Sequence, residues 1–320
     1  MANDLIDDLP ATTHKGFGDW YRKRGAFIEA SAYYLIALER DPKLTIARYR
    51  LACAMSASAP ETDLGLFWLE GAVEAGFWGA PALKEDEAFA SHHESERYKA
   101  ALATVEGRYA NAVLDWKSRS VVAFPTEVPE GSTLPAMIFL HGFGDHHRSY
   151  IGRIHELKKH NFVGIAVSGT MPFCEDSLRW NQLDVESTHE AIQAAIKRHV
   201  AEGVPLDESR IYLTGFSQGA LHASKLLALY PDAYRGGIAL SIGGSQELVA
   251  PIDVDKKRPL FGVWGTAEHP GNIALMEEAR ELWGAAALPW REHTHDGQHH
   301  FPGDWETVLP EALEWLRSFE

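Results

Sequence analysis

The fold of this chain is decided by one stretch, Ile211-Tyr212-Leu213-Thr214-Gly215-Phe216-Ser217-Gln218-Gly219-Ala220. It begins as a short apolar run, turns at two glycines that flank Ser217, and continues into a helical pattern that reaches Leu229. A strand, a tight turn and a helix in this order expose a serine hydroxyl at the carboxyl end of a sheet. The glycines are needed because such a turn is strained and passes close to neighbouring backbone. The stretch predicts a nucleophilic serine, and the alternative is an ordinary structural turn.

A second glycine-flanked loop, His141-Gly142-Phe143-Gly144-Asp145, directly follows the apolar run Ala136–Leu140. A serine that attacks an ester needs two backbone N–H donors for the negative oxygen of the tetrahedral intermediate, each worth ~3 kcal/mol. A loop at a strand end can supply one donor from Phe143, and Gln218, the residue after the serine, can supply the other. The alternative is an ordinary glycine-rich connection between a strand and a helix.

From about Ala112 onwards, short apolar or β-branched runs alternate with longer amphipathic stretches. The strand-like runs are Ser120–Phe124, Ala136–Leu140, Val163–Val167, Ile211–Thr214, Gly237–Ser241, Leu260–Trp264 and Trp290–His293. The helical stretches are Ser149–His160, Asp184–Ala201, Gln218–Leu229, Ile273–Ala286 and Trp305–Phe319. This alternation predicts an α/β domain in which helices cover both faces of a mostly parallel sheet. The first run is followed by Pro125 and Pro129 and predicts an antiparallel edge strand.

The preceding part of the chain, from about Thr13 to Glu106, has a helical pattern throughout. Alanines are abundant, aromatic residues recur at helical spacing, and no strand alternation occurs. One tetratricopeptide-like unit, with a period of ~34 residues, is suggested by Gly18, Tyr21, Ala30, Tyr34, Ala37 and Pro42. A degenerate second copy is suggested by Leu51, Ala52, Met55, Gly65, Leu69 and Ala72.

These patterns predict an all-α, TPR-like domain over residues 1–110 and a catalytic domain over residues 111–320. Two such units are fewer than the ~3 usually needed for independent stability. We therefore expect the helical domain to pack on the catalytic domain or on a second copy of the chain. Binding of a partner protein is one use of this architecture, and a plain helical scaffold is the other.

A histidine-rich segment, His295-Asp296-Gly297-Gln298-His299-His300-Phe301-Pro302, lies between the last predicted strand and the final helix. Together with His141–Asp145 and Gly215–Ala220, it resembles the carboxylesterase, acyl-protein thioesterase and lysophospholipase branch of the α/β-hydrolases. The resemblance covers most of Val121–Glu320. It implies the α/β-hydrolase fold, a catalytic serine, acid and histidine in that chain order, and no metal or organic cofactor.

The family pattern for the catalytic base is a glycine shortly before a histidine, followed by one residue and an aromatic-proline pair. His299 fits this pattern, and His300 is the competing candidate. His293 and His295 alternate along the last strand and fit it less well.

The acid that orients the histidine departs from the family pattern, which has an aspartate in the loop after the penultimate strand. Here Trp264-Gly265-Thr266-Ala267-Glu268-His269-Pro270 places Glu268 at that point. Glutamate can serve, provided that its longer side chain reaches the imidazole N–H. Asp296 is a substitute, and a solvated loop carboxylate is the other interpretation of Glu268.

Two further groups of residues are candidates for a role in the site. Trp180 lies in the long loop after Val163–Val167, where the family has an aromatic residue, so it either lines the substrate pocket or anchors the loop. His146-His147 and the C-terminal histidines have spacings that match no metal-binding helix motif, and we predict no metal site.

The composition limits which partners the protein is expected to bind and in which compartment it is expected to lie. The formal net charge of −15 argues against nucleic acid or an anionic membrane as a partner. The only two cysteines, Cys53 and Cys174, are expected in different domains, without a disulfide, as in a reducing compartment. Met1–Pro10 does not match a signal peptide, and no apolar run approaches the ~18 residues of a membrane span. A cytoplasmic location is expected.

The sequence thus predicts a serine esterase that acts on small-molecule esters or thioesters through an acyl-enzyme. A carboxylesterase is the first interpretation, and an acyl-protein thioesterase or lysophospholipase is the second. A third interpretation, of another class, is an adaptor whose helical repeats bind a partner protein while the hydrolase domain is vestigial.

Overall fold

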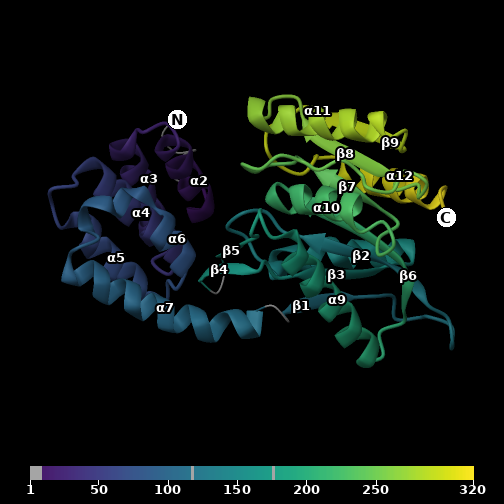
Figure 1. Cartoon of the computed structure of the whole chain (residues 1–320), viewed down its shortest axis with the longest axis horizontal. Coiled ribbons are helices and arrows are strands. Elements are labelled where there is room, and N and C mark those ends of the chain that lie inside the picture. Colours follow the sequence, from purple (N-terminus) through teal and green to yellow (C-terminus); the bar gives the residue numbers. More distant parts are fainter. Residues whose placement is uncertain (1–8, 117–118, 175–176) are drawn as a thin grey trace. The chain divides into compact units, whose positions relative to one another are not determined.

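The computed structural model describes residues 9–116, 119–174 and 177–320. The chain folds into two compact units. The first unit is helical and comprises the residues up to Leu114 together with Met171–Ser177, and the second comprises Asp115–Thr170 and Leu178–Glu320 and contains the large sheet (Figure 1).

The second unit is built on a seven-stranded sheet with the strand order β1-β3-β2-β6-β7-β8-β9. The strands are β1 (Ser120–Ala123), β2 (Leu134–Leu140), β3 (Val163–Val167), β6 (Leu206–Phe216), β7 (Gly236–Leu240), β8 (Leu260–Gly265) and β9 (Trp290–His295). Neighbouring strands of this sheet pair in parallel, except that β1 pairs antiparallel with β3 at the edge. The predicted α/β class and the antiparallel edge strand are confirmed.

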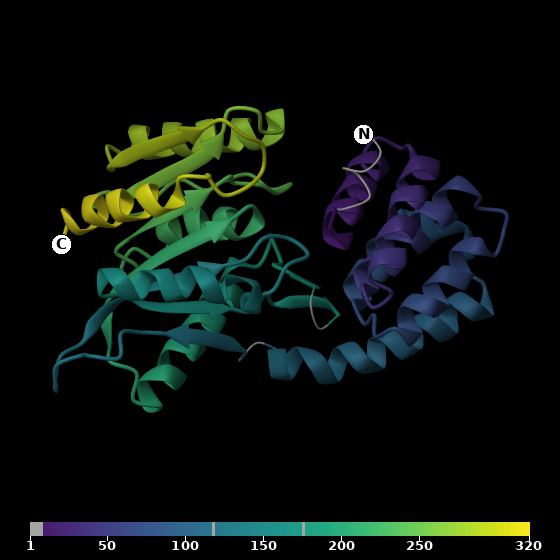
Figure 2. The same cartoon turned by 180° about the vertical axis from the view of Figure 1, so that it is seen from behind.

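Helices cover both faces of this sheet, as its alternating side chains require. They are α8 (Ile151–Glu156), α9 (Val185–Ala201), α10 (Gln218–Leu229), α11 (Pro270–Ala285) and α12 (Trp305–Arg317). Figure 2 shows the sheet with helices on both of its faces. Along β2, Ile138 joins the core under α9, α10 and α11, whereas its neighbour Met137 joins the core under α12.

One predicted helix is broken. The stretch expected to be helical over Ser149–His160 is instead the short helix α8 between two 3₁₀ turns, η2 (His147–Tyr150) and η3 (Leu157–His160). Asn161 ends it in the left-handed conformation, with φ of 56°.

The first unit confirms the prediction of an all-helical N-terminal part. Its elements are α2 (Ala11–Arg22), α3 (Phe27–Arg40), α4 (Thr45–Ser58), α5 (Leu64–Glu74), α6 (Ala80–Glu85), the 3₁₀ helix η1 (Glu87–His92) and α7 (Glu96–Trp116). Successive helices approach closely at small residues: a β-carbon on Gly18 would stand 2.5 Å from the Tyr34 ring, and one on Gly65 would stand 2.0 Å from the Ser56 hydroxyl oxygen. These contacts fit the proposed repeat, which stays a prediction.

The placement of the two cysteines corrects an expectation. Cys174 lies on β4 (Met171–Cys174), which pairs with β5 (Ser177–Arg179) and comes from the catalytic half of the sequence. Cys174 is nevertheless buried in the apolar core of the helical unit, in the same cluster as Cys53. Neither cysteine forms a disulfide. The sequence could not show this, because the packing of β4 depends on contacts with distant helices.

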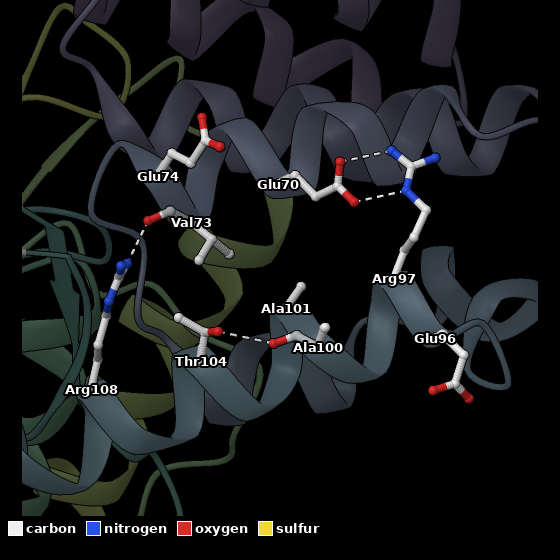
Figure 3. A pocket seen from close by; sticks show the side chains of 9 residues that line it. All are labelled: Glu70, Val73, Glu74, Glu96, Arg97, Ala100, Ala101, Thr104 and Arg108. Carbon is white, nitrogen blue, oxygen red and sulfur yellow. Dashed lines mark hydrogen bonds and ion pairs between the residues drawn. The ribbon is translucent and has the colours of Figure 1, made fainter.

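A groove of about 530 Å³ opens between α5 and α7 in the helical unit (Figure 3). Two arginines of α7 reach across it. Arg97 donates to both carboxylate oxygens of Glu70 at 2.7 Å, and Arg108 donates to the carbonyl oxygen of Val73. Small side chains, among them Ala101, line the space between these two bridges.

Across the described ranges, none of the helices combines the length and the apolar character that a membrane crossing requires.

Candidate active site

Ser217 stands at the turn between β6 and α10, in a strained backbone conformation with φ of 56° and ψ of −120°. Residues other than glycine rarely have a positive φ, and backbone strain of this kind concentrates at functional sites. The turn has no room for larger neighbours, since a β-carbon on Gly219 would stand 2.1 Å from the carbonyl oxygen of Leu140. The Ser217 N–H donates to the carbonyl oxygen of Leu240 at 2.9 Å, which ties the turn to β7.

Two segments predicted to stabilise an oxyanion meet at this turn. Gln218 is the first residue of α10, where backbone N–H groups lack an acceptor within the helix. A β-carbon on Gly142 would stand 3.5 Å from the Ser217 β-carbon, so the loop that carries Phe143 packs against the serine. The Phe143 side chain is half-exposed.

His141 holds this loop in place and stays uncharged. The Gly169 N–H donates to Nε2 of His141 at 2.8 Å, so the ring proton is on Nδ1, which lies 2.7 Å from the carbonyl oxygen of Gly142. Burial lowers the pKa of His141 to about 4. The histidine of the glycine-rich loop is therefore a structural anchor.

The structure brings His299 onto Glu268. Nδ1 of His299 lies 2.9 Å from Oε2 and 3.1 Å from Oε1 of the carboxylate. Glu268 comes from the loop after β8 and its side chain is fully buried, whereas His299 comes from the loop after β9 and its side chain is 35% exposed. The aromatic ring of Phe216 supports the imidazole, with ring centroids 4.7 Å apart.

Ser217 and His299 converge at Gly243, in the loop after β7. A β-carbon on Gly243 would stand 2.9 Å from the Ser217 Oγ and 3.5 Å from Cε1 of His299. The same position would lie 3.4 Å from Oδ1 of Asn272. Only a glycine leaves the serine hydroxyl and the imidazole free of a steric clash here.

The buried carboxyl of Glu268 is held in its ionised form. Burial alone would raise the pKa of this group, but hydrogen bonds from His299 and Asn272 outweigh it, so the pKa lies below its ordinary value. An ionised acid at Nδ1 places the imidazole proton on that nitrogen and leaves Nε2 as a base.

The competing candidates have other contacts. Nδ1 of His300 lies 2.7 Å from the carbonyl oxygen of Phe301, and its ring faces His295 at 5.1 Å. His293 faces Asp304 at 3.7 Å. Asp296 is exposed on the surface. His299 is the candidate whose ring contacts the predicted acid.

Trp180 is a buried anchor in this structure, with 1% of its surface exposed. Its Nε1 donates to the carbonyl oxygen of His141 at 2.8 Å, and its backbone N–H donates to Oε1 of Gln218 at 2.9 Å. These contacts match the loop-anchor interpretation, and a role in lining the substrate pocket stays a prediction.

Sequence reasoning missed Gly243 and Asn272. Gly243-Gly244 was visible as a glycine pair after a predicted strand, but its closeness to Ser217 depends on the sheet order. Asn272 gave no signal, because it lies in the first turn of α11 without a recognised motif. Within the described ranges, no group of three or more His, Cys, Asp or Glu residues is arranged to hold a metal ion.

A mostly parallel sheet with a strained serine between a central strand and its helix defines the α/β-hydrolase fold. The chain belongs to the phospholipase/carboxylesterase family, whose model matches residues 123–317.

Solved structures with a similar fold include an uncharacterised protein from Bacillus cereus ATCC 10987, which is 13% identical with a TM-score of 0.50. That match covers 98% of this chain and 100% of that protein, so the likeness of fold extends over the helical part. The Bacillus cereus carboxylesterase is 19% identical with a TM-score of 0.48, over 65% of this chain and 99% of the esterase. A comparison with curated proteins returned no match.

Proposed function

We propose that this protein is a serine hydrolase that cleaves carboxylic esters, with Ser217 as nucleophile, His299 as base and Glu268 as the orienting acid. The observation that carries the proposal is the contact of His299 with the buried carboxylate of Glu268, beside a serine held at a strained turn. Membership of the phospholipase/carboxylesterase family supports the same chemistry.

In the proposed cycle, Nε2 of His299 takes the proton of Ser217 as its oxygen attacks the ester carbonyl carbon. The backbone N–H groups of Phe143 and Gln218 stabilise the negative oxygen that forms. His299 then gives the proton to the leaving alcohol, and an acyl-enzyme remains on Ser217. Water, deprotonated by His299, attacks this ester. His299 then returns the proton to Oγ of Ser217 as the bond to the acyl group breaks, and the acid is released. Glu268 stabilises the imidazolium in both steps.

Hydrolysis of p-nitrophenyl esters from acetate to laurate, with the wild type and Ser217→Ala, tests the proposal. The wild type is expected to turn over at least one ester, and the variant is expected to lose about 10³-fold or more in kcat. Circular dichroism and the melting temperature show whether the variant is folded. A wild type that hydrolyses no ester and is not labelled by a fluorophosphonate contradicts the proposal.

The chain-length profile also separates the related activities. A preference for long acyl chains, followed by turnover of an acyl-thioester or a lysophospholipid, would favour an acyl-protein thioesterase or lysophospholipase. The adaptor interpretation gains support if the wild type is inactive and unlabelled. The adaptor interpretation does not explain the contact between His299 and Glu268, because an inactive hydrolase domain would not require it.

The proposal includes a cytoplasmic location, since neither Cys53 nor Cys174 forms a disulfide. It also assigns the helical unit, as a TPR-like domain over residues 1–110, to binding a partner protein or a second copy of the chain. Cell fractionation tests the location, and light scattering of the full chain tests self-association.

A further inference from the structure

Asn272 lies beside the acid and the histidine of the proposed triad. Its Nδ2 donates to Oε2 of Glu268 at 2.9 Å and lies 3.1 Å from Nδ1 of His299. Its backbone is fixed in the first turn of α11, because its N–H donates to the carbonyl oxygen of His269 at 2.8 Å. The side chain of His269 caps the same helix by accepting from the Gly271 N–H at 3.1 Å. The amide therefore projects from a rigid element.

The carboxylate determines which way this amide points. An amide oxygen 2.9 Å from Oε2 of Glu268 would bring two acceptors together, so the atom at that position is the nitrogen. An amide nitrogen donates and does not accept, so Nδ2 of Asn272 is not the acceptor of the proton on Nδ1 of His299. That proton has the Glu268 carboxylate as its acceptor, and Nε2 stays free to act as the base.

A glutamate needs such a second contact more than an aspartate does. Its side chain has one more rotatable bond, so its carboxylate is positioned less well by its own backbone. The uncharged polar side chains around the pair include Asn272 from α11, Ser241 after β7 and Ser217. Asn272 is the amide donor among them.

We propose that Asn272 is a positioning residue that holds the carboxylate of Glu268 in place and thereby fixes the orientation of His299. This inference rests on the proposed triad. It assigns a fourth side chain to the site, on an element that the triad does not use.

The test compares Asn272→Ala and Asn272→Asp with Glu277→Gln, a control at an exposed position on the same helix. For Asn272→Ala we expect kcat to fall roughly tenfold with KM within about twofold, because a misplaced catalytic group slows the reaction rather than binding. For Asn272→Asp we expect the acid limb of the pH profile of kcat/KM to move up by about one pH unit, because a second carboxylate stabilises the imidazolium. Melting temperatures report whether each variant is folded.

A second readout does not depend on turnover. In a proton NMR spectrum, the Nδ1 proton of His299 shared with Glu268 is expected as a resolved downfield signal, absent in Glu268→Gln and shifted or broadened in Asn272→Ala. Wild-type values of kcat, pH profile and this signal in Asn272→Ala would overturn the inference. If the wild type neither hydrolyses esters nor reacts with a fluorophosphonate, the proposed function fails, and the signal alone decides whether Asn272 positions the pair.

Discussion

The charge on Glu268 is the residue-scale property on which the proposed mechanism depends. Replacing this carboxylate by the neutral amide in Glu268→Gln removes the negative charge beside Nδ1 of His299. The new amide NH2 can donate to Nδ1, which would place the imidazole proton on Nε2. We expect kcat to fall by roughly 10³–10⁴-fold, the cost of the wrong tautomer in such triads. Steady-state kinetics measure the loss, and an unchanged melting temperature would show that it is not a loss of folding. Activity within about tenfold of the wild type would exclude Glu268 as the acid.

The space beside Ser217 gives a second prediction. In Gly243→Ala, the new methyl group would stand 2.9 Å from the serine oxygen. We expect kcat/KM for p-nitrophenyl acetate to fall by about 10²-fold, since a displacement of about 1 Å has a cost of this size. Gly152→Ala is the matched control, because nothing lies within 4 Å of its β-carbon. Equal activity of both variants would contradict the convergence of Ser217 and His299 at Gly243.

Among the residues of the site, the sequence predicted those whose neighbours in the chain form a recognisable pattern. Ser217 has a strand before it and a helix after it, and His299 has the family pattern around it. Asn272 could not be found, because its role arises only when the start of α11 meets His299, which follows β9 in the chain. The role of Trp180 stayed open for a similar reason: burial of a loop aromatic depends on what the rest of the loop packs against.

At the scale of elements, the close approach of α4 and α5 makes a prediction about stability. In Gly65→Ala, the added methyl group meets the backbone as well as the side chain of Ser56, whose α-carbon would lie 2.9 Å away. We expect a loss of ~1–3 kcal/mol in the free energy of unfolding, as for other overpacked sites. Gly107→Ala on α7 has nothing within 4 Å and should be neutral or gain up to ~1 kcal/mol.

Urea unfolding followed by circular dichroism measures both variants. The comparison is sensitive to the repeat-like packing, because both substitutions replace a helical glycine by alanine and only the β-carbon at position 65 meets other atoms. A Gly65→Ala protein as stable as Gly107→Ala would show that α4 and α5 are not held together at this contact.

The helices and strands were largely predictable, because the spacing of apolar residues and the presence of turn residues are local properties of the sequence. All seven strand-like runs of the catalytic part became strands of one sheet. The broken helix at Ser149–His160 and the pairing of β4 with β5 were not predicted. Both depend on short segments whose conformation is set by tertiary contacts rather than by pattern.

For the catalytic unit as a whole, three buried histidines predict acid sensitivity. Burial lowers the pKa of His141 and His147 to about 4 and that of His222 to about 3. The ordinary value in an unfolded chain is about 6.5. Below that pH the unfolded state binds protons that the folded state does not, so stability is lost as the pH falls from about 6.5 toward 4.

The expected loss is on the order of 1–3 kcal/mol per histidine. It is absent above about pH 6.5 and grows as the pH falls toward 4. Urea unfolding at several pH values between 7.5 and 4.5 measures it. His222→Gln should have a smaller decrease over this range than the wild type, because glutamine does not titrate. An identical pH dependence in the two proteins would show that His222 does not contribute.

The segment Met171–Ser177 has a consequence for how such a protein can be rearranged genetically. Strand β4 is encoded in the middle of the hydrolase sequence, yet Cys174 is buried among side chains of the helical unit. A recombination event that exchanged only the first 110 codons would separate β4 from the side chains that bury Cys174. Apolar surface exposed in this way favours aggregation. The two halves of this gene are therefore constrained to be inherited together, or to exchange β4 along with the helices.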